Sequence, residues 1–387
     1  MGMSTSNIRK LAFLVLFLVL AGFASAEFKD LRYFKEKVVV SDAFTEKRML
    51  SEWLTSLKGT WGDTPVYFYD SGKPGATVLI YGGAHPYEPA GTIAVYVIME
   101  NLQLTNGRFI LVPRADMSAS TEGILGNAYP QYLHIPTSWG QQKYRIGDRE
   151  TALIDQWPDP FTYVHYPSKQ NLAYQDLRNF NRTFPGRPDG TLTERMSYAF
   201  MELIRNEKID LVIDFHEASL MYPVVDTYVT HQRAEDVAMM AAMMCQIEMP
   251  MKCEVSPKGL RGLTHREIGD YSDALCVLIE TAEPFIDRVV GRVTEQLMID
   301  GKDEFLERAS EKGLLYTSYD ISDAPTIDHR VARLLTASLE LIKMYDQFYP
   351  DKAVEFWYPR FTDVKTNGLG SYLHDPASAD PSRVFEN

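Results

Sequence analysis

Two histidines and two glutamates stand where their side chains could gather at one edge of a sheet. His85 and Glu88 are three residues apart and follow an apolar run and a Gly-Gly turn. His216 and Glu280 each follow a further apolar run. In open α/β sheets, ligands bind outside the carboxyl ends of the strands. The sequence therefore predicts that these four side chains lie at one such edge.

His85, Glu88 and His216 together form a possible zinc site. Zinc binds imidazole nitrogen and carboxylate oxygen, and a catalytic site with two His and one Glu leaves a fourth position for water. We expect one zinc ion per chain at these residues. The alternative is a solvated turn or cap at each position. Asp214, alternate to His216 on its strand, is either an acceptor for a ring N–H or an ordinary strand-end carboxylate.

Glu280, Asn181 and Arg182 could supply the remaining chemistry. A carboxylate after a buried strand is costly unless it is solvated in a cleft or paired. Beside a zinc-bound water, Glu280 would be the general base, and otherwise an acid near a helix cap. The guanidinium of Arg182, beside Asn181, suits a substrate carboxylate, although it could equally be a structural arginine.

Five motifs in chain order, between residues 66 and 284, resemble those of a known family. They are GGAHPYEPAG, PRA, NFNRTFPG, DFHEAS and ALCVLIETAEP. The family is the zinc carboxypeptidase superfamily, in particular its succinylglutamate desuccinylase/aspartoacylase-like branch. The resemblance implies a mixed eight-stranded sheet between helices and a zinc-dependent amide hydrolase. It also implies roles for six residues: metal ligands His85, Glu88 and His216, catalytic Glu280, and Asn181 and Arg182 on the substrate carboxylate.

The chain departs from the family pattern at three points. The pair Asn179–Phe180 stands where the family usually has Asp-Leu. The arginine that polarises the scissile carbonyl has Arg178 as its nearest match, with Arg145 and Arg149 as alternatives. Tyr271 is the candidate for the tyrosine that caps the substrate. These departures leave the substrate open.

The N-terminus is typical of a secretory signal peptide. Arg9 and Lys10 precede the apolar run 11–21, and the small residues 24–26 precede Glu27. We expect residues 1–26 to be removed, which would make the protein secreted or periplasmic, without stable membrane association after cleavage. The alternative is an uncleaved anchor, for which the apolar run is short.

The net charge limits the classes of binding partner, and the cysteines allow at most one disulfide. Loss of Arg9 and Lys10 would lower the formal charge from −13 to −15, which argues against nucleic acid and anionic membranes. A small peptide or N-acyl amino acid that bears a carboxylate is the expected partner. Cys245 and Cys253 could form a disulfide, or all the cysteines could be buried thiols.

Apolar runs that alternate with helical segments predict an α/β fold, with a mixed, mostly parallel sheet sandwiched by helices. The strands are expected at 65–69, 76–81, 108–112, 211–215, 224–229 and 274–279. The helices are expected from about 89, at 192–207, at 285–299 and at 327–348. We further expect a helical lead-in over 27–60, an ordered excursion over 117–170, and a methionine stripe at 239–244 that packs in the core. Residues 27–350 would form one zinc hydrolase domain, with core motifs at 66–284 and a helical part at 285–350, and 351–387 an irregular tail.

The sequence as a whole predicts an exported zinc-dependent amide hydrolase that uses zinc-activated water. It would be either a metallocarboxypeptidase or an N-acyl amino acid deacylase. The alternatives are a secreted metal- or peptide-binding protein without turnover, and an α/β domain without a metal. Glu280 distinguishes the hydrolase from the binding protein, because a binding protein needs no general base beside the metal.

Overall fold

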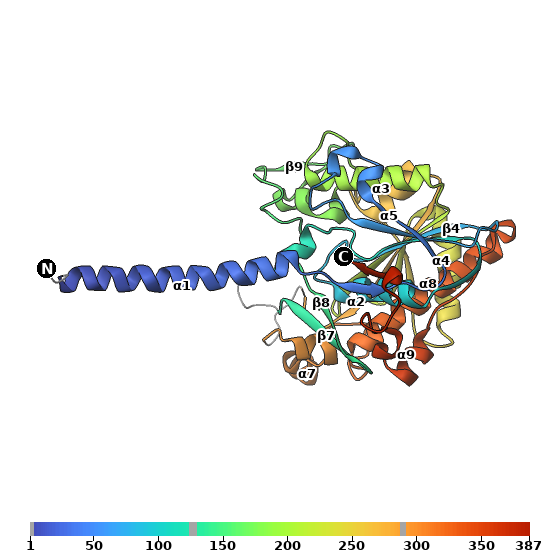
Figure 1. The fold of residues 1–387 in the computed structure, drawn as a ribbon. Coiled ribbons are helices and arrows are strands. Elements are labelled where there is room, and N and C mark those ends of the chain that lie inside the picture. The colour runs from blue at the N-terminus through green and yellow to red at the C-terminus, as the bar shows by residue number, and fades with distance from the viewer. Residues whose placement is uncertain (1–3, 124–129, 287–291) are drawn as a thin grey trace.

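An eight-stranded mixed sheet runs through the centre of the computed structural model, which describes residues 4–123, 130–286 and 292–387 (Figure 1). In spatial order its strands are β13 (Lys252–Val255), β12 (Thr227–Thr230), β14 (Leu275–Glu283), β11 (Leu211–Ser219), β4 (Thr77–Tyr81), β6 (Arg108–Val112), β3 (Pro65–Asp70) and β2 (Phe44–Met49). Neighbouring strands are parallel from β14 through β11 and β4 to β6, and between β12 and β13. The remaining pairings are antiparallel. The predicted α/β fold is confirmed.

Helices cover both faces of this sheet because its central strands bury side chains on both sides. In β4, Val78 and Ile80 pack into one core cluster, whereas Leu79 and Tyr81 pack into the other. Such continuous apolar runs are typical of strands covered on both faces. The first cluster is completed by α2 (Pro89–Asn101), α4 (Glu235–Cys245) and α8 (Ile327–Phe348), and the second by α3 (Leu192–Asn206) and α5 (Thr264–Tyr271).

Predicted elements near the sheet lie within a few residues of the observed ones. The strand predicted at 108–112 is β6, and the helix predicted at 327–348 is α8. The helix predicted at 285–299 falls partly on residues 287–291, which lie outside the described residues. After them come α6 (Glu295–Asp300) and α7 (Glu304–Glu311).

The N-terminal helix α1 (Thr5–Tyr33) projects from the body of the molecule (Figure 1). It is long and apolar enough to cross a membrane, and none of its most apolar stretch is buried. At its end Leu31 and Arg32 are buried, and Arg32 lies 3.1 Å from Thr121 Oγ1 and 2.5 Å from Asp155 Oδ1. Such a helix fits a signal sequence and a membrane anchor alike.

The helical lead-in predicted over 27–60 was wrong beyond Tyr33. The chain there forms β1 (Lys37–Val39) and β2, followed by two short 3-10 helices, 50–52 and 55–57. β1 pairs with β16 (Val384–Glu386) and β2 pairs with β3. Strand pairing with distant parts of the chain overrides the local helical spacing.

The excursion over 117–170 is ordered where the structure describes it, which excludes residues 124–129. β7 (Tyr132–Thr137) and β8 (Gly140–Arg145) form an antiparallel hairpin. β9 (Tyr163–Val164) and β10 (Asn171–Leu172) form another. The predicted ordered excursion is confirmed for this part of the chain.

The tail 351–387 is not irregular, as the sequence had indicated. It contains β15 (Glu355–Trp357), which pairs with β5 (Gln103–Asn106), and it also contains α9 (Phe361–Asn367) and β16. Leu369 and Leu373 are buried in the first core cluster. The tail completes the fold through contacts with residues far away in sequence, which local patterns cannot reveal.

The methionine stripe of α4 faces outward, so the prediction that it packs in the core was wrong. Met239, Met240, Met243 and Met244 are 36–64% exposed. The inward face of α4 carries small residues such as Ala238 and Ala241, because the helix lies close against α8. All three cysteines are free thiols, so Cys245 and Cys253 do not form a disulfide.

Candidate active site

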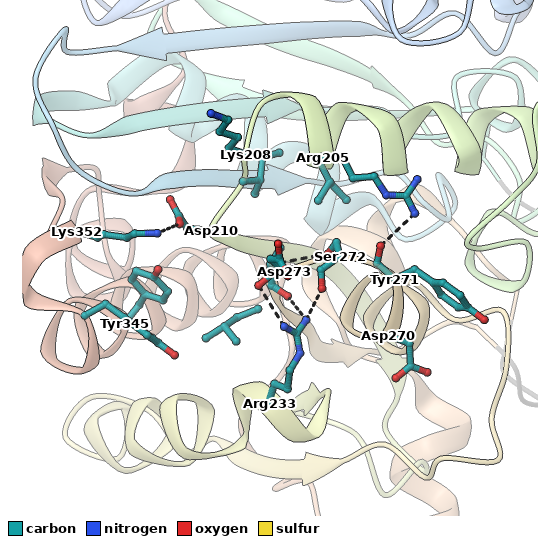
Figure 2. A pocket seen from close by; sticks show the side chains of 15 residues that line it. Arg205, Lys208, Asp210, Arg233, Asp270, Tyr271, Ser272, Asp273, Tyr345 and Lys352 are labelled. Carbon is teal, nitrogen blue, oxygen red and sulfur yellow. Dashed lines mark hydrogen bonds and ion pairs between the residues drawn. The ribbon is translucent and has the colours of Figure 1, made fainter.

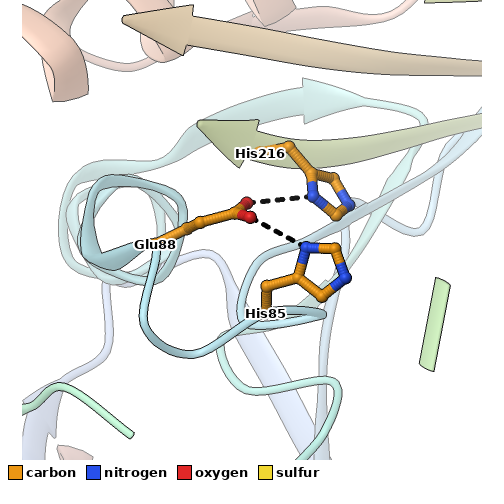
Figure 3. A group of neighbouring side chains, drawn as sticks. All are labelled: His85, Glu88 and His216. Atoms are coloured by element: carbon orange, nitrogen blue, oxygen red, sulfur yellow. Dashed lines mark hydrogen bonds and ion pairs between the residues drawn. The ribbon is translucent and has the colours of Figure 1, made fainter. Parts of the chain in front are cut away.

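His85, Glu88 and His216 come together at the carboxyl ends of β4 and β11 (Figure 3). Their possible ligand atoms all lie within 4.8 Å of one another, and all three side chains are buried. The two oxygens of Glu88 lie 2.8 Å from Nδ1 of His85 and 3.0 Å from Nδ1 of His216. The turn that carries His85 needs Gly82, because a Cβ there would lie 2.5 Å from the backbone of Gly91 in α2.

A hydrogen bond on the far side of the His85 ring and an ion pair on the far side of the His216 ring orient the two histidines. Nε2 of His85 lies 3.0 Å from Oδ1 of Asn179, and Nε2 of His216 lies 3.0 Å from Oδ2 of Asp214. These contacts leave both Nδ1 atoms directed at Glu88. Carboxylate or carbonyl partners on the outer ring nitrogen are typical of metal-binding histidines.

The electrostatics of the three residues fit a cation. Burial lowers the pKa of His85 to about 3, with Arg149 acting in the same direction, so its imidazole is neutral. Burial opposes ionisation of Glu88, yet His85 and His216 hold the pKa of its carboxyl below the usual value. Burial likewise opposes charge on His216, but Asp214 and Glu88 raise its pKa well above the usual value. A buried carboxylate between two imidazole nitrogens is the nitrogen and oxygen donor set that zinc prefers.

Glu280 lies beside His216, because β11 and β14 are parallel and pair these two residues in register. Its Oε2 is buried and makes no hydrogen bond to the described residues. Burial raises the pKa of Glu280 to about 8; His216 opposes this rise, and the charges of Glu88 and Asp214 add to it. The site therefore contains a carboxyl group that can take up and release a proton near neutral pH.

Asn181 and Arg182 line the same cavity, which has a volume of about 220 Å³. Oδ1 of Asn181 accepts a hydrogen bond from the backbone N–H of Thr264, so its Nδ2 is the group left for a ligand. Arg182 Nη1 donates to the Asn181 carbonyl oxygen at 2.6 Å. Burial lowers the pKa of Arg182, and no carboxylate of the described residues forms an ion pair with it. An anion in the cavity would find this charge available.

The structure does not bring Arg178 to the cavity. Its Nε lies 2.8 Å from Asp159 Oδ1, and its Nη1 donates to the Thr151 carbonyl oxygen. Arg145 lies elsewhere as well, with Nη2 3.6 Å from the sulfur of Met117. The cavity is lined instead by the second alternative, Arg149. Its Nη1 is 3.9 Å from Oε1 of Glu88.

Tyr271 lies in a different cavity, of about 1120 Å³ (Figure 2). That cavity lies at the opposite ends of the strands, where β11 and β14 begin. The backbone carbonyl of Tyr271 accepts a hydrogen bond from Arg205, and its side chain is 39% exposed. Tyr271 therefore does not reach the metal-binding side chains.

Some polar residues that build the site were not singled out as site residues in the sequence. Ser256 and His265 line it, and Asn179 supports it from behind His85. The departure from the family pattern at Asn179 was a signal for that residue. His265 gave no signal, because a single histidine in a helical segment has no distinctive spacing.

A comparison with known protein families finds one family model that is similar to part of the chain. Residues 165–300 match the model of the succinylglutamate desuccinylase/aspartoacylase catalytic domain. The match covers less than half of the chain. The matched segment includes Asn181, Arg182, His216 and Glu280, whereas His85 and Glu88 precede it. The match confirms the resemblance and makes the chain similar to metal-dependent amide hydrolases.

Several solved structures are similar to the chain. An aspartoacylase family protein from Mesorhizobium loti is 19% identical, with 56% of each chain covered and a TM-score of 0.34. The product-bound ectoine utilization protein EutE from Ruegeria pomeroyi is 20% identical, covering 56% of this chain and 53% of that one, with a TM-score of 0.33. A metallo-carboxypeptidase from Burkholderia cenocepacia is 11% identical, covering 84% and 69%, with a TM-score of 0.44.

The chain thus spans just over half the length of the first two of these structures. No curated protein sequence matches it.

Proposed function

We propose that this chain is an exported, zinc-dependent hydrolase that cleaves an amide bond in a small substrate with a carboxylate. The substrate is either a peptide C-terminus or an N-acyl amino acid. One observation carries the proposal: the free carboxyl oxygen of Glu280 lies in the same buried cavity as the His85–Glu88–His216 triad. A protein that only bound a metal or peptide would have no use for this costly group.

The triad would hold one zinc ion, with Glu88 and the two Nδ1 atoms as ligands. When bound, zinc polarises the scissile carbonyl and lowers the pKa of a water molecule toward neutrality. Glu280 would accept the proton of that water at Oε2 and pass it to the nitrogen of the leaving amine. The raised pKa of Glu280, about 8, suits a group that must both take and return a proton.

Arg182 and Asn181 would hold the carboxylate of the substrate through the guanidinium and through Nδ2 of the amide. We assign the arginine nearest the scissile carbonyl to Arg149 in place of Arg178, because Arg149 lines the cavity and lies 3.9 Å from Glu88. Its positive charge would stabilise the oxygen that becomes negative during the reaction.

Export would depend on α1. The basic, apolar and small-residue segments support cleavage after residue 26, and the exposed helix is compatible with it. The mature chain would then be one hydrolase domain that begins at Glu27 and that the tail 351–387 completes. Sequencing of the N-terminus of the exported protein should start at Glu27; a start at Met1 would show that the helix is retained.

The function is tested by a hydrolysis screen with zinc-loaded protein. The substrates are peptides with free C-termini and N-acyl amino acids, and the release of amine is measured. Glu280→Gln is nearly isosteric and should keep zinc while kcat falls by about a hundredfold or more. Zinc-replete Glu280→Gln protein with wild-type turnover would overturn the role of Glu280. Absence of turnover for every substrate would favour a binding protein.

A further inference from the structure

The cavity beside the triad contains two buried polar groups without a hydrogen-bond partner among the described residues. His265 is 3% exposed, and neither of its ring nitrogens is bonded. Ser256 is 2% exposed, and its Oγ is likewise unbonded. Both residues line the cavity. An unsatisfied buried polar group is costly, so a ligand that forms hydrogen bonds with these groups removes that cost.

Their positions relative to Arg182 and the triad are fixed. Thr264, which precedes His265, donates its N–H to Asn181 Oδ1 and its hydroxyl to Asp214 Oδ2, at 2.8 and 2.6 Å. Gly262 packs directly on the Asn181–Arg182 segment, because a Cβ there would lie 2.2 Å from the Arg182 carbonyl oxygen. The start of α5 is thereby tied to the carboxylate-binding pair and to the partner of His216.

Ser256 is held by its backbone alone. Its N–H donates to the Thr230 carbonyl oxygen at 3.0 Å, and its own carbonyl oxygen accepts from Gln232 Nε2 at 3.0 Å. The hydroxyl takes no part in these bonds. It can therefore donate and accept freely toward the cavity.

His265 is uncharged in this environment. Burial lowers its pKa to about 3, and the charges of Arg266 and His216 act in the same direction. A neutral imidazole offers one donor and one acceptor, and the serine hydroxyl offers the same pair. The complementary ligand group both donates and accepts, as a carboxamide does.

Apolar side chains form much of the cavity wall. They include Tyr222, Val224, Val229, Leu260, Leu263 and Leu278. Glu254 also lines the cavity, and its negative charge disfavours an acidic ligand group there. The nearby cation Arg266 already donates to Gln232 Oε1 and to the Ser256 carbonyl oxygen. Burial of a charge without a partner is costly, so an uncharged tip is favoured.

We propose that the part of the cavity beside His265 and Ser256 binds the side chain of the substrate's amino acid and selects a carboxamide on an apolar stem, as in glutamine. His265 and Ser256 hold the amide, and the aliphatic wall packs on the methylene groups. The inference rests on the proposed function in one respect: Arg182 holds the carboxylate of the same amino acid. It names the substrate class that the metal site alone leaves open.

The test compares three side chains of similar length: N-acetylglutamine, N-acetylmethionine and N-acetylglutamate. Dissociation constants are measured by calorimetry on zinc-loaded Glu280→Gln protein, and kcat/KM on the zinc-loaded wild type. We expect glutamine to be preferred over methionine and over glutamate by about tenfold, the value of one or two satisfied hydrogen bonds.

Two variants and one matched control identify the groups responsible. Both His265→Phe and Ser256→Ala, made in the wild type and in the Glu280→Gln protein, should lower the preference for glutamine over methionine by about five- to tenfold. The control is His329→Phe. His329 in α8 is 1% exposed, and its ring nitrogens make no hydrogen bond to the described residues, although Nδ1 lies 3.5 Å from Asp323 Oδ2. It does not line the cavity. This variant should keep the wild-type preference, and thermal unfolding should show that neither phenylalanine unfolds the protein.

Each outcome decides between two claims. Tighter binding of methionine or glutamate, equal binding of all three, or an unchanged preference in both variants would overturn the carboxamide site. Turnover without a preference would overturn the carboxamide site and leave the hydrolase function intact. Preferential binding of glutamine without turnover would support the site and overturn the hydrolase function.

Discussion

The two edges of the central sheet carry two cavities that differ in how their polar groups are used. The larger cavity, about 1120 Å³, lies where β11 and β14 begin. Its charges are satisfied by neighbours: Lys352 lies 2.5 Å from Asp210, and Arg233 donates to three backbone carbonyls within 2.8 Å (Figure 2). The smaller cavity, about 220 Å³, lies at the carboxyl ends and keeps Glu280 Oε2, Ser256 Oγ and the His265 ring unbonded.

We interpret this difference as that between a structural cavity and a functional one. Among the described residues, none that lines the larger cavity has a buried polar atom without a partner. Native proteins rarely leave buried polar groups unsatisfied, so those of the smaller cavity call for a ligand. The volume of a cavity therefore does not indicate which of the two binds the substrate.

The largest expected effect comes from removal of one metal ligand. His216→Ala should abolish activity and stoichiometric zinc binding, because catalytic zinc sites use three protein ligands and only two would remain. Metal analysis of the purified variant and circular dichroism check the result. Asp270→Ala, in the larger cavity, is the matched control and should keep its zinc. Full zinc content in His216→Ala would place the metal elsewhere.

The next effect concerns the substrate carboxylate. Arg182→Met should lower kcat/KM by about ten- to a hundredfold for substrates with a free carboxylate, because a charge-assisted contact is lost. Substrates whose carboxylate is amidated should lose little. The measurement is the ratio of kcat/KM for matched acid and amide. Equal losses for both would make Arg182 a structural arginine.

The sequence predicted the central sheet and the triad because both depend on local order. Apolar runs followed by His or Glu indicate the carboxyl ends of strands, and parallel pairing then brings His216 beside Glu280. The sequence could not predict where Arg178 and Arg149 point, since Arg149 lies in the excursion over 117–170 and Arg178 lies shortly after it. Strand pairing of the tail with β1 and β5 was equally invisible, because it joins residues hundreds of positions apart.

Glu100, which lines neither cavity discussed above, has a buried carboxyl group that resembles Glu280 only in its raised pKa. Burial raises the pKa of Glu100 to about 8, yet both its oxygens accept backbone hydrogen bonds, from Val39 and His374. Because the folded pKa exceeds the unfolded value near 4.5, Glu100 contributes stability below pH 4.5 that is lost as the pH rises through 8. Glu100→Gln should remove this pH-dependent loss, which a pKa shift of that size makes about 4–5 kcal/mol, and should leave activity unchanged.

Denaturant unfolding of wild type and Glu100→Gln at several pH values between 5 and 9 checks this expectation. If the two curves stay parallel, Glu100 is ionised over the whole range. If activity falls with the substitution, hydrogen-bonded carboxyl groups also matter to function, and the distinction between the two kinds of buried group fails.

The smallest effect is expected in the larger cavity itself. Lys352 pairs with Asp210, but its side chain is about half exposed, so solvent screens the pair. Lys352→Met should therefore lower the free energy of unfolding by about 0–1 kcal/mol and leave zinc content and kcat/KM at wild-type values. Asp210 would still accept the backbone N–H of Thr77 at 2.9 Å, so the start of β4 stays anchored. Denaturation and a standard assay measure both quantities. A tenfold fall in kcat/KM at wild-type stability would show that the larger cavity acts on the reaction, and satisfied polar groups would then no longer mark a cavity as structural.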